Sequence, residues 1–415
     1  MDVLFVVPYV PNLIRVRPYN FIRYLGRRGH RVTVLTLWSD EQEHQDIARL
    51  REECHAVRAV RLPRWRSAVN SLLAVPTHAP VQSAYCWQPE LLADQRLEGL
   101  RPDVVHVEHL RGARFALALR QWQRRQGRPT PVVWDSVDCI SLLFRHAAAR
   151  SRRWVSRLIT RFELGRTERY EGWLLGQFDR TLVTSRIDRE ALLALAESGQ
   201  AGPAAAPDLR VIPNGVDLGY FAPAPDQARE PATLVLSGKM SYHANVTMAV
   251  HFAQEILPRV RAHRPDVKLW VVGKEPAAEV RALAADPAIT VTGTVPDMRP
   301  YLQQATLAVA PVAYGVGIQN KVLEAMACGA PVVASPQSVS ALDLQPGRDV
   351  QVAEQPEAFA AAILNLLNDP AQRAALGRAG RRYVETHHDW ATIAARLEEA
   401  YQGAPERAAI GSRSH

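Results

Sequence analysis

The chain has 415 residues, of which 47% are hydrophobic and 22% charged, and its formal net charge is +8 at pH 7. Because this length exceeds what one hydrophobic core usually serves, two domains of about 200 residues each are expected. No apolar run reaches the ~20 residues of a membrane span, so no spanning helix is expected. The four cysteines are scattered without CxxC spacing and are expected to be buried thiols in a reducing cytosol.

The first half of the chain alternates short apolar runs with amphipathic segments. Its N-terminus, MDVLFVVPYV, lacks the basic region and cleavage site of a signal peptide and is expected to form the first strand. This alternation favours an α/β fold with a parallel sheet covered by helices on both faces. The predicted strands of this half are residues 3–7, 31–36, 104–107, 132–134 and 180–184.

Polar residues follow several of these strands, where an open α/β sheet places its ligands. The loop after the first strand, PYVPNLIRVRPYN, offers Arg15 and Arg17, which either grip an acceptor diphosphate or are merely solvated. His109 follows the third predicted strand, and Asp135 and Asp138 of the segment WDSVD follow the fourth. All five are candidates for acceptor binding or catalysis, and for His109 the alternative is a polar loop residue without function.

Much of the basic charge is concentrated in residues 145–169, RHAAARSRRWVSRLITRFELGRTER. The segment interleaves apolar side chains with arginines at near-helical spacing, among them Arg150, Arg152, Arg153 and Arg157. Such a pattern suits an amphipathic helix on an anionic membrane surface. The alternative is a surface helix whose apolar stripe packs on its own domain. Nucleic acid is not an expected partner, because no recognised binding module accompanies the arginines.

A composition break separates the two halves. The Gly-, Ala- and Pro-rich runs at 199–210 and 222–232 bracket a short strand and the turn IPNGVD, and they are interpreted as the interdomain connection. No GxGxxG follows any strand of the second half, so a nicotinamide cofactor has no support. A helix through about Val260, a final helix at 390–401 and a disordered polar tail at 403–415 are also expected. The second half restarts with predicted strands at 233–237, 268–272, 290–292, 307–311 and 331–334, which indicate another Rossmann-like sheet.

Residues 315–335, GVGIQNKVLEAMACGAPVVAS, place Lys321 and Glu324 on an otherwise apolar helix. Gly315 and Gly317 let backbone N–H groups approach a ligand, and a helix N-terminus favours a diphosphate. Lys321 adds a point charge, and Glu324 one turn later can accept hydrogen bonds from a ribose. The alternative is a solvated i, i+3 ion pair worth ~0.2–0.5 kcal/mol. Lysine occurs only at 239, 268, 274 and 321, and this scarcity favours a demand for a compact ammonium.

Several motifs together resemble the retaining family-4-type glycosyltransferases of the GT-B fold. They are IPNGVD, SGKMSYHANV, VVGKEP, VTGTVPDMRPYLQQATLAVAP and the loop–helix block at 315–335, and the match covers about 208–401. SGKMSYHANV and GIQNKVLEAMA further resemble sugar transferases of bacterial exopolysaccharide and exosortase loci. The resemblance implies two Rossmann-like domains that face each other across a cleft. The expected divisions are an acceptor domain at 1–207, a nucleotide-sugar domain at 208–387, a helix at 388–403 that packs back on the first domain, and a tail at 404–415.

Carried over residue by residue, the resemblance assigns Glu324 to the donor ribose, as the second glutamate of an E-x7-E motif. The first glutamate is replaced by Val316, and the phosphate pair appears as Lys239, which follows Gly238, and Ala244. Lys321 replaces the lost charge, and His109 takes the place of an interdomain histidine near the donor sugar. The donor-binding segment is then Gly317, Ile318, Gln319, Asn320, Lys321 and Val322.

The resemblance implies a retaining hexosyltransferase with a UDP- or GDP-sugar donor. Lys239, Lys321 and the helix N-terminus would stabilise charge on the leaving β-phosphate, so no metal cofactor is required. The expected acceptor is a saccharide or a polyprenyl-diphosphate-linked glycan, and the expected location is cytoplasmic, at the inner face of the cytoplasmic membrane. The alternatives are a non-catalytic protein that binds a nucleotide sugar or a partner, and a nucleotide-sugar epimerase of the same fold.

Overall fold

The computed structural model describes residues 1–93, 97, 99–127, 129–150, 154–200, 207–224, 228–314 and 317–403, with the backbone alone at 147, 149, 150, 154–159, 199 and 200. Val316, the side chains of the four arginines predicted to bind membrane, and the tail at 404–415 lie outside this description. The chain forms two compact units, one from Met1–Pro213 with the segment that starts at Ile393, the other from Asn214–Thr392. They are called unit 1 and unit 2.

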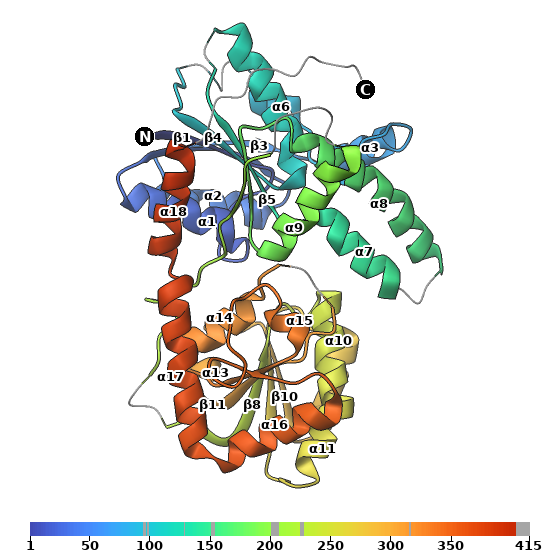
Figure 1. Cartoon of the computed structure of the whole chain (residues 1–415), viewed down its shortest axis with the longest axis vertical. Helices are drawn as coiled ribbons and strands as arrows, with labels where there is room; N and C mark the ends of the chain where they lie inside the picture. The colour runs from blue at the N-terminus through green and yellow to red at the C-terminus, as the bar shows by residue number, and fades with distance from the viewer. Residues whose placement is uncertain are drawn as a thin grey trace. The chain divides into compact units, whose positions relative to one another are not determined.

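Unit 1 is built on a parallel seven-stranded sheet with the order β3-β2-β1-β4-β5-β6-β7 (Figure 1). The strand order reverses between β1 and β4, which makes this edge the switch point where an open sheet accepts ligands. Central strands such as β1 are apolar on both faces because helices cover both. The strands are β1 (Asp2–Val7), β2 (Arg31–Trp38), β3 (Ala56–Arg61), β4 (Val104–Glu108), β5 (Val132–Val137), β6 (Arg180–Val183) and β7 (Leu209–Val211).

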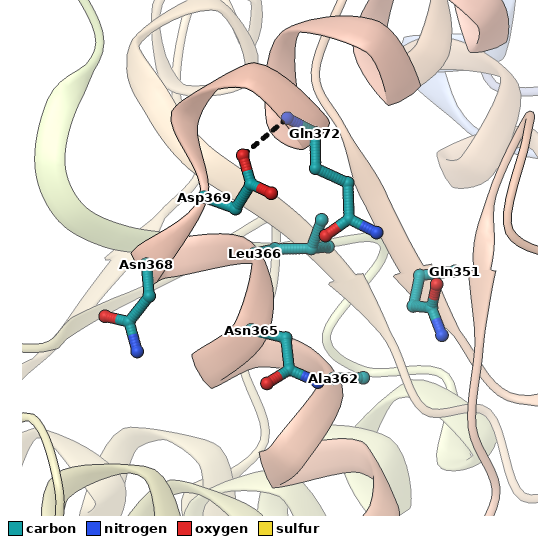
Figure 2. A pocket seen from close by; sticks show the side chains of 7 residues that line it. All are labelled: Gln351, Ala362, Asn365, Leu366, Asn368, Asp369 and Gln372. Atoms are coloured by element: carbon teal, nitrogen blue, oxygen red, sulfur yellow. Dashed lines mark hydrogen bonds between the residues drawn. The ribbon is translucent and has the colours of Figure 1, made fainter.

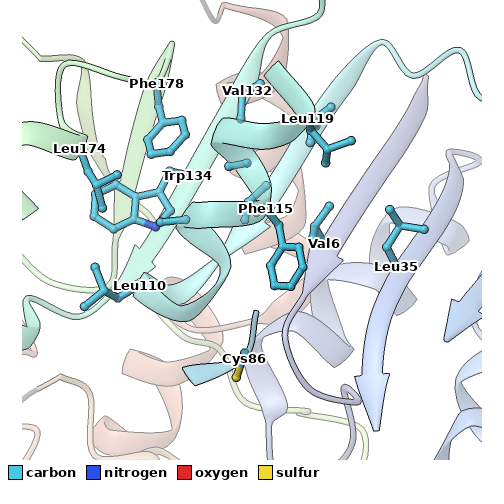
Figure 3. Packing of buried hydrophobic residues seen from close by; sticks show 14 of the residues in the cluster. Val6, Leu35, Cys86, Leu110, Phe115, Leu119, Val132, Trp134, Leu174 and Phe178 are labelled. Carbon is cyan, nitrogen blue, oxygen red and sulfur yellow. The ribbon is translucent and has the colours of Figure 1, made fainter. Parts of the chain in front are cut away.

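The helices of unit 1 pack a core around Trp134, Phe115 and Phe178 (Figure 3). The described helices are α1 (Val16–Arg27), α2 (Glu41–Glu52), α3 (Arg64–Ala74), α4 (Val81–Tyr85), η1 (Pro89–Leu92), α6 (His109–Arg125), α7 (Ile140–Arg150), α8 (Trp154–Leu174), α9 (Arg186–Leu195) and η2 (Ala196–Gln200). The chain returns through α18 (Trp390–Gln402), whose part from Ile393 belongs to this unit.

Unit 2 repeats the architecture with a parallel six-stranded sheet in the order β10-β9-β8-β11-β12-β13. Its strands are β8 (Glu230–Ser237), β9 (Lys268–Val272), β10 (Ile289–Gly293), β11 (Ala305–Ala310), β12 (Val332–Ala334) and β13 (Gln351–Val352). The described helices are α10 (His243–His251), η3 (Phe252–Ile256), α11 (Leu257–Arg261), α12 (Ala278–Ala282), η4 (Leu283–Ala285), α13 (Arg299–Gln304), α14 (Asn320–Ala327), α15 (Pro336–Val339), α16 (Pro356–Asn368) and α17 (Pro370–His387).

The α/β fold with two parallel sheets is confirmed, and the differences are local. Asp135 lies inside β5 and not after it, since that strand continues three residues beyond the predicted end. The helix predicted to run through Val260 is divided into α10, a π-turn and α11. Strands β3 and β13 were not predicted, because AVRAVR carries arginines at an edge and β13 has two residues. Among the described helices, none is both long and apolar enough to cross a membrane.

Candidate functional site

In unit 2 the candidate residues gather beside the switch point between β8 and β11. Gly238 follows β8 with φ +148, and a Cβ there would lie 2.8 Å from Asn245 Nδ2 and 3.4 Å from Lys321 Cε. Gly273 follows β9 with φ +155, and a Cβ there would lie 1.7 Å from the carbonyl oxygen of Gly238. Glycine is therefore required at both positions, by backbone conformation and by space. The two loops bring backbone, Asn245 and Lys321 together at the carboxyl ends of the strands.

Lys321 is fixed by two side chains at the start of α14. Its ammonium donates to Asn245 Oδ1 and Gln319 Oε1, each at 3.0 Å. Burial lowers the pKa of Lys321 to about 8, and the nearby Glu324 carboxylate opposes that shift. The two acceptors are neutral amide oxygens, so they orient the ammonium without forming an ion pair with it. The geometry is that of a cation prepared to meet an anion.

Glu324 lies one turn further along α14, between the buried residues Leu323 and Ala325. Burial raises its pKa to about 7, and Lys321 partly offsets the effect. Both groups therefore change charge near neutral pH. Lys321 and Glu324 are both only partly exposed, whereas the alternative interpretation expects a solvated helix face.

The other residues of the predicted donor segment surround this pair. Gly317 has φ +70, in the left-handed region, and Ile318 packs into the apolar cluster beneath α14. Gln319 is the N-cap residue, and its side chain holds Lys321. Asn320 Oδ1 is buried and has no hydrogen-bond partner among the described residues, so it is an acceptor that a ligand hydroxyl could satisfy. Val322 is buried and anchors the first turn.

Lys239 differs from Lys321 in its surroundings. Its side chain is 48% exposed, and its ammonium lies 3.2 Å from Glu275 Oε2, itself an exposed carboxylate. Such a surface pair is worth at most ~1 kcal/mol, so an incoming diphosphate can displace Glu275 at little cost. Lys239 follows Gly238 directly and remains next to the same loop.

In unit 1, His109 begins α6 immediately after β4. Its φ of +66 is unusual for a residue other than glycine and indicates local strain. The backbone N–H of Arg111 donates to His109 Nδ1 at 3.3 Å. Burial and the Arg111 charge lower the His109 pKa to about 3, so the ring is neutral at physiological pH. Because Nδ1 accepts a hydrogen bond, the proton lies on Nε2, which leaves a neutral N–H donor.

Arg17 and Asp135 form a buried pair with each other. Arg17 Nε lies 2.7 Å from Asp135 Oδ2, and its Nη2 lies 3.1 Å from Oδ1. The same guanidinium donates to the carbonyl of Ile212 at 2.8 Å. Burial alone would raise the pKa of Asp135, but Arg17 and His106 outweigh it and hold the pKa at about 2. Arg17 therefore has a structural role, because its contacts join α1 to β5 and to the residue that directly follows β7.

Arg15 and Asp138 complete the set predicted in unit 1. Arg15 pairs with Glu43 at 2.7 Å and lies over the ring of Tyr9, 4.4 Å from its centroid. Asp138 accepts from Thr184 Oγ1 at 3.1 Å, and burial together with the neighbouring Asp188 raises its pKa to about 7. All five predicted residues of unit 1 thus lie near the carboxyl ends of β1, β4 and β5, each with a partner within the unit.

Comparison with known proteins covers both units. The family model "Glycosyl transferase 4-like domain" matches residues 14–215, and the model "Glycosyl transferases group 1" matches residues 231–369. The chain belongs to the family-4-type glycosyltransferases of the GT-B fold. The first match includes His109, and the second includes Lys321 and Glu324.

Relatives and solved structures agree with this assignment. The glycosyltransferase is 27% identical over 400 residues to the glycogen synthase of Mycobacterium tuberculosis, which spans 92% of this chain and 88% of the relative. It is 33% identical over 227 residues to the phosphatidyl-myo-inositol mannosyltransferase of Mycolicibacterium smegmatis. That alignment spans 52% of this chain and 57% of the relative. In fold it is similar to the HepE protein of Anabaena, solved in complex with UDP, with a TM-score of 0.66 at 13% identity over 97% of this chain and 100% of that one.

Two residues of the glycosyltransferase site, Asn245 and Glu108, were not predicted. Asn245, which holds Lys321 together with the predicted Gln319, carries no sequence signal beyond its place in SGKMSYHANV. Glu108, the last residue of β4, is 2% exposed, and its Oε2 has no hydrogen-bond partner among the described residues. Burial and Asp135 raise the pKa of Glu108 to about 8. A glutamate at the end of the apolar run VVHVE, directly before His109, was a signal that could have identified it.

One surface pocket lies apart from these residues. Figure 2 shows it on unit 2, between the end of α16 and the start of α17. Asn365, Asn368 and Gln372 line it, and the carboxylate of Asp369 caps α17 by accepting from the backbone of Gln372 at 2.9 Å. Since its one charged residue serves as a helix cap, we do not assign the donor site to this pocket.

Proposed function

We propose that this glycosyltransferase uses a UDP- or GDP-sugar as donor and that α14 binds the donor's diphosphate and ribose. The observation that carries the proposal is Lys321, a desolvated ammonium oriented by Asn245 and Gln319 beside the close-packed Gly238 loop. Glu324 accepts the ribose hydroxyls, and Asn320 Oδ1 accepts from a hydroxyl of the sugar. The fold similarity to HepE, which was solved with UDP, supports a nucleotide donor. The carboxyl edge of an open α/β sheet is where such folds place their ligands.

The proposed reaction is a transfer of a hexose with retention of configuration. The bond between the anomeric carbon and the β-phosphate oxygen breaks, the acceptor hydroxyl attacks the same face, and its proton passes to the departing phosphate. Lys239, Lys321 and the α14 N-terminus stabilise the charge that develops on the diphosphate. His109 contributes a neutral Nε2–H donor to the sugar. No metal is needed for this charge stabilisation, and no protein nucleophile is required.

The proposed acceptor is a saccharide or a polyprenyl-diphosphate-linked glycan, as in exopolysaccharide or other glycan biosynthesis. Support comes from the name of the mannosyltransferase relative, whose acceptor is a phosphatidyl lipid. The proposed location is the cytoplasm, at the inner face of the cytoplasmic membrane, with residues 145–169 facing anionic lipid. Arg15 remains a candidate for the acceptor diphosphate, since its side chain is 36% exposed beside its partner Glu43.

A screen of nucleotide diphosphates and their sugars by thermal shift tests the donor. We expect UDP or GDP, together with one of its sugars, to raise the melting temperature, whereas ADP or CDP does not. Donor hydrolysis should then proceed at the same rate after EDTA treatment. A complete loss of hydrolysis that magnesium or manganese restores would contradict the metal-free mechanism.

A second candidate function is a non-catalytic protein that binds a nucleotide sugar or a partner. The replacement of the first glutamate by Val316, and Ala244 in place of a cation, favour this alternative. The donor-hydrolysis assay separates the two, because a binding protein would show the thermal shift without release of sugar. An epimerase would interconvert the sugar of the donor and leave the nucleotide diphosphate sugar intact.

A further inference from the structure

Helix α3 of unit 1 is amphipathic, but it buries polar residues and exposes apolar ones. Its buried residues include the polar Ser67 and Asn70, and the Asn70 amide donates to the carbonyls of Tyr85 at 3.3 Å and Trp87 at 2.8 Å. A surface helix normally buries its apolar stripe instead. The side exposed to solvent carries Trp65, Val69, Leu72 and Leu73, which are 63%, 42%, 71% and 67% exposed.

The exposed apolar side extends to the middle of α8. Val75, 50% exposed, follows α3, and Phe162 on α8 is 54% exposed. The Arg166 guanidinium lies 4.9 Å from the centroid of the Phe162 ring and donates to the carbonyls of Ala74 and Thr77, each at 2.6 Å. These contacts fix the end of α3 against α8. We call Trp65, Val69, Leu72, Leu73, Val75 and Phe162 the α3 surface.

The charged side chains in the segment that forms α3 are all positive. Residues 61–89 contain no Asp or Glu, and arginines stand at 61, 64 and 66. Arg61 and Arg64 are exposed, on either side of the turn that leads from β3 into the helix. An apolar face with Trp at its border and arginines beside it matches the boundary between phosphate headgroups and acyl chains.

We propose that the α3 surface docks this glycosyltransferase on an anionic lipid bilayer. Trp65, Leu72 and Leu73 insert at the acyl boundary, and Arg61 and Arg64 contact the lipid phosphates. A second copy of the chain is a poorer occupant, because two α3 surfaces placed face to face would bring like charges together. Lipid phosphates would instead neutralise them.

The position of α3 in unit 1 determines which edge of the sheet would lie near the membrane. The helix begins three residues after β3 ends at Arg61, so it starts from the same edge of the sheet as His109 does after β4. Docking would therefore hold this edge near the membrane. The docking itself is independent of the donor, and only its consequence for a lipid-linked acceptor rests on the proposed function.

Co-sedimentation with vesicles tests the proposal. The variant carries Trp65→Ser, Leu72→Ser and Leu73→Ser, all at exposed positions, and Ile187→Ser on α9, 40% exposed, is the matched control. On vesicles with about 30% phosphatidylglycerol, we expect the triple variant to partition at least tenfold less than the parent, and the control to partition like the parent. Thermal melting and donor hydrolysis should be unchanged in both.

The salt dependence of vesicle binding distinguishes the α3 surface from the basic segment at 145–169. Apolar insertion is not screened, so the parent should keep part of its binding at about 0.5 M salt, and the triple variant should lose what remains. The variant with Gln at Arg150, Arg152, Arg153 and Arg157 should lose binding mainly at about 0.1 M salt. The proposal is overturned if the triple variant binds vesicles like the parent, if the parent binds none, or if light scattering shows that the triple variant dissociates a dimer of the parent.

Discussion

At the scale of single residues, Glu324 and Lys321 carry most of the functional argument, and each can be tested alone. Glu324→Ala should weaken UDP or GDP affinity by ~1.5–3 kcal/mol, because a ribose hydrogen bond to a charged acceptor is lost. Titration calorimetry measures the change. The control is Glu357→Ala, which removes an exposed carboxylate paired with Arg259 on the surface. If nucleotide binding is unchanged in Glu324→Ala, Glu324 is not part of the site.

The two shifted pKa values predict how nucleotide affinity depends on pH. Glu324 with a pKa of about 7 is mostly protonated at pH 6, so affinity should rise several-fold between pH 6 and 7.5 as the carboxylate forms. Lys321 with a pKa of about 8 loses its charge above that value, so affinity should fall again by pH 9. In Glu324→Gln, the rise in affinity between pH 6 and 7.5 that comes from Glu324 should be absent, and the fall toward pH 9 should remain. Any change in affinity that comes from titration of the nucleotide itself should persist in this variant. A flat profile between pH 6 and 9 would exclude this pair as the charge-bearing groups.

The two lysines should differ in degree. Lys321→Ala and Lys239→Ala are both expected to lower kcat more than they raise the KM for donor, because each acts on the charge of the leaving diphosphate. The loss should be larger for Lys321, which is partly buried and oriented by two amides, than for Lys239, which is exposed and paired with Glu275. Lys268→Ala at the amino end of β9 removes an exposed lysine as a control. A change confined to KM would mean that the lysines bind without catalysing.

The sequence predicted the residues that carry charge better than those that position it. Lys321 and Glu324 could be recognised because a charged pair is conspicuous on the apolar helix NKVLEAMA. Asn245 lies 76 positions from Lys321 in the chain, and an amide on a helix has no signature that reveals such a contact. Arg17 shows the converse, since its partners Asp135 and Ile212 are 118 and 195 positions away. Sequence could suggest a phosphate for that arginine but not its buried pair.

At the scale of elements, the Arg17–Asp135 pair joins α1 to β5 inside unit 1. Arg17→Met should destabilise the protein by ~3–5 kcal/mol, because the Asp135 carboxylate is then buried without its partner. Arg17→Met combined with Asp135→Leu should recover part of the loss. Because the pKa of Asp135 in the folded state is about 2, below its unfolded value, the stability it contributes is present above about pH 4 and is lost toward pH 2. Denaturant unfolding at pH 7 and pH 3 measures both effects, and equal stability of Arg17→Met and the parent would contradict them.

Elements differ in how well sequence predicts them, and the reason is burial. Strands such as β1 and β11 are buried on both faces and appear as continuous apolar runs, so they are predictable. Strand β7 at the edge begins within a run interpreted as connection, because its three residues LRV have no periodicity to detect. Helix α3 was not predicted as a surface for a different reason: its exposed residues are apolar, and its buried ones include Ser67 and Asn70.

At the scale of the whole molecule, the chain crosses between the two units twice. It leaves unit 1 after Pro213 and returns at Ile393 through α18. The return segment is part of the core of unit 1: Ile393, Leu397 and Tyr401 are buried, and Tyr401 Oη lies 2.9 Å from His106 Nδ1. Arg180 of β6 also donates to the carbonyl of Ala400. Thus a helix at the far end of the sequence packs into the unit that carries His109.

This connection predicts opposite outcomes for two truncations. A chain that ends at Thr392 loses the buried side chains of Ile393, Leu397 and Tyr401, each worth ~1.5–3 kcal/mol, and exposes the apolar surface beneath them. We expect a loss on the order of 5 kcal/mol, which lowers the melting temperature by about 10 °C or more. A chain that ends at Gly403 keeps every contact described here and should melt like the parent. Nucleotide should still shift the melting of unit 2 in both truncations, since the contacts around Lys321 lie within that unit. If the chain that ends at Thr392 melts like the parent, α18 does not stabilise unit 1.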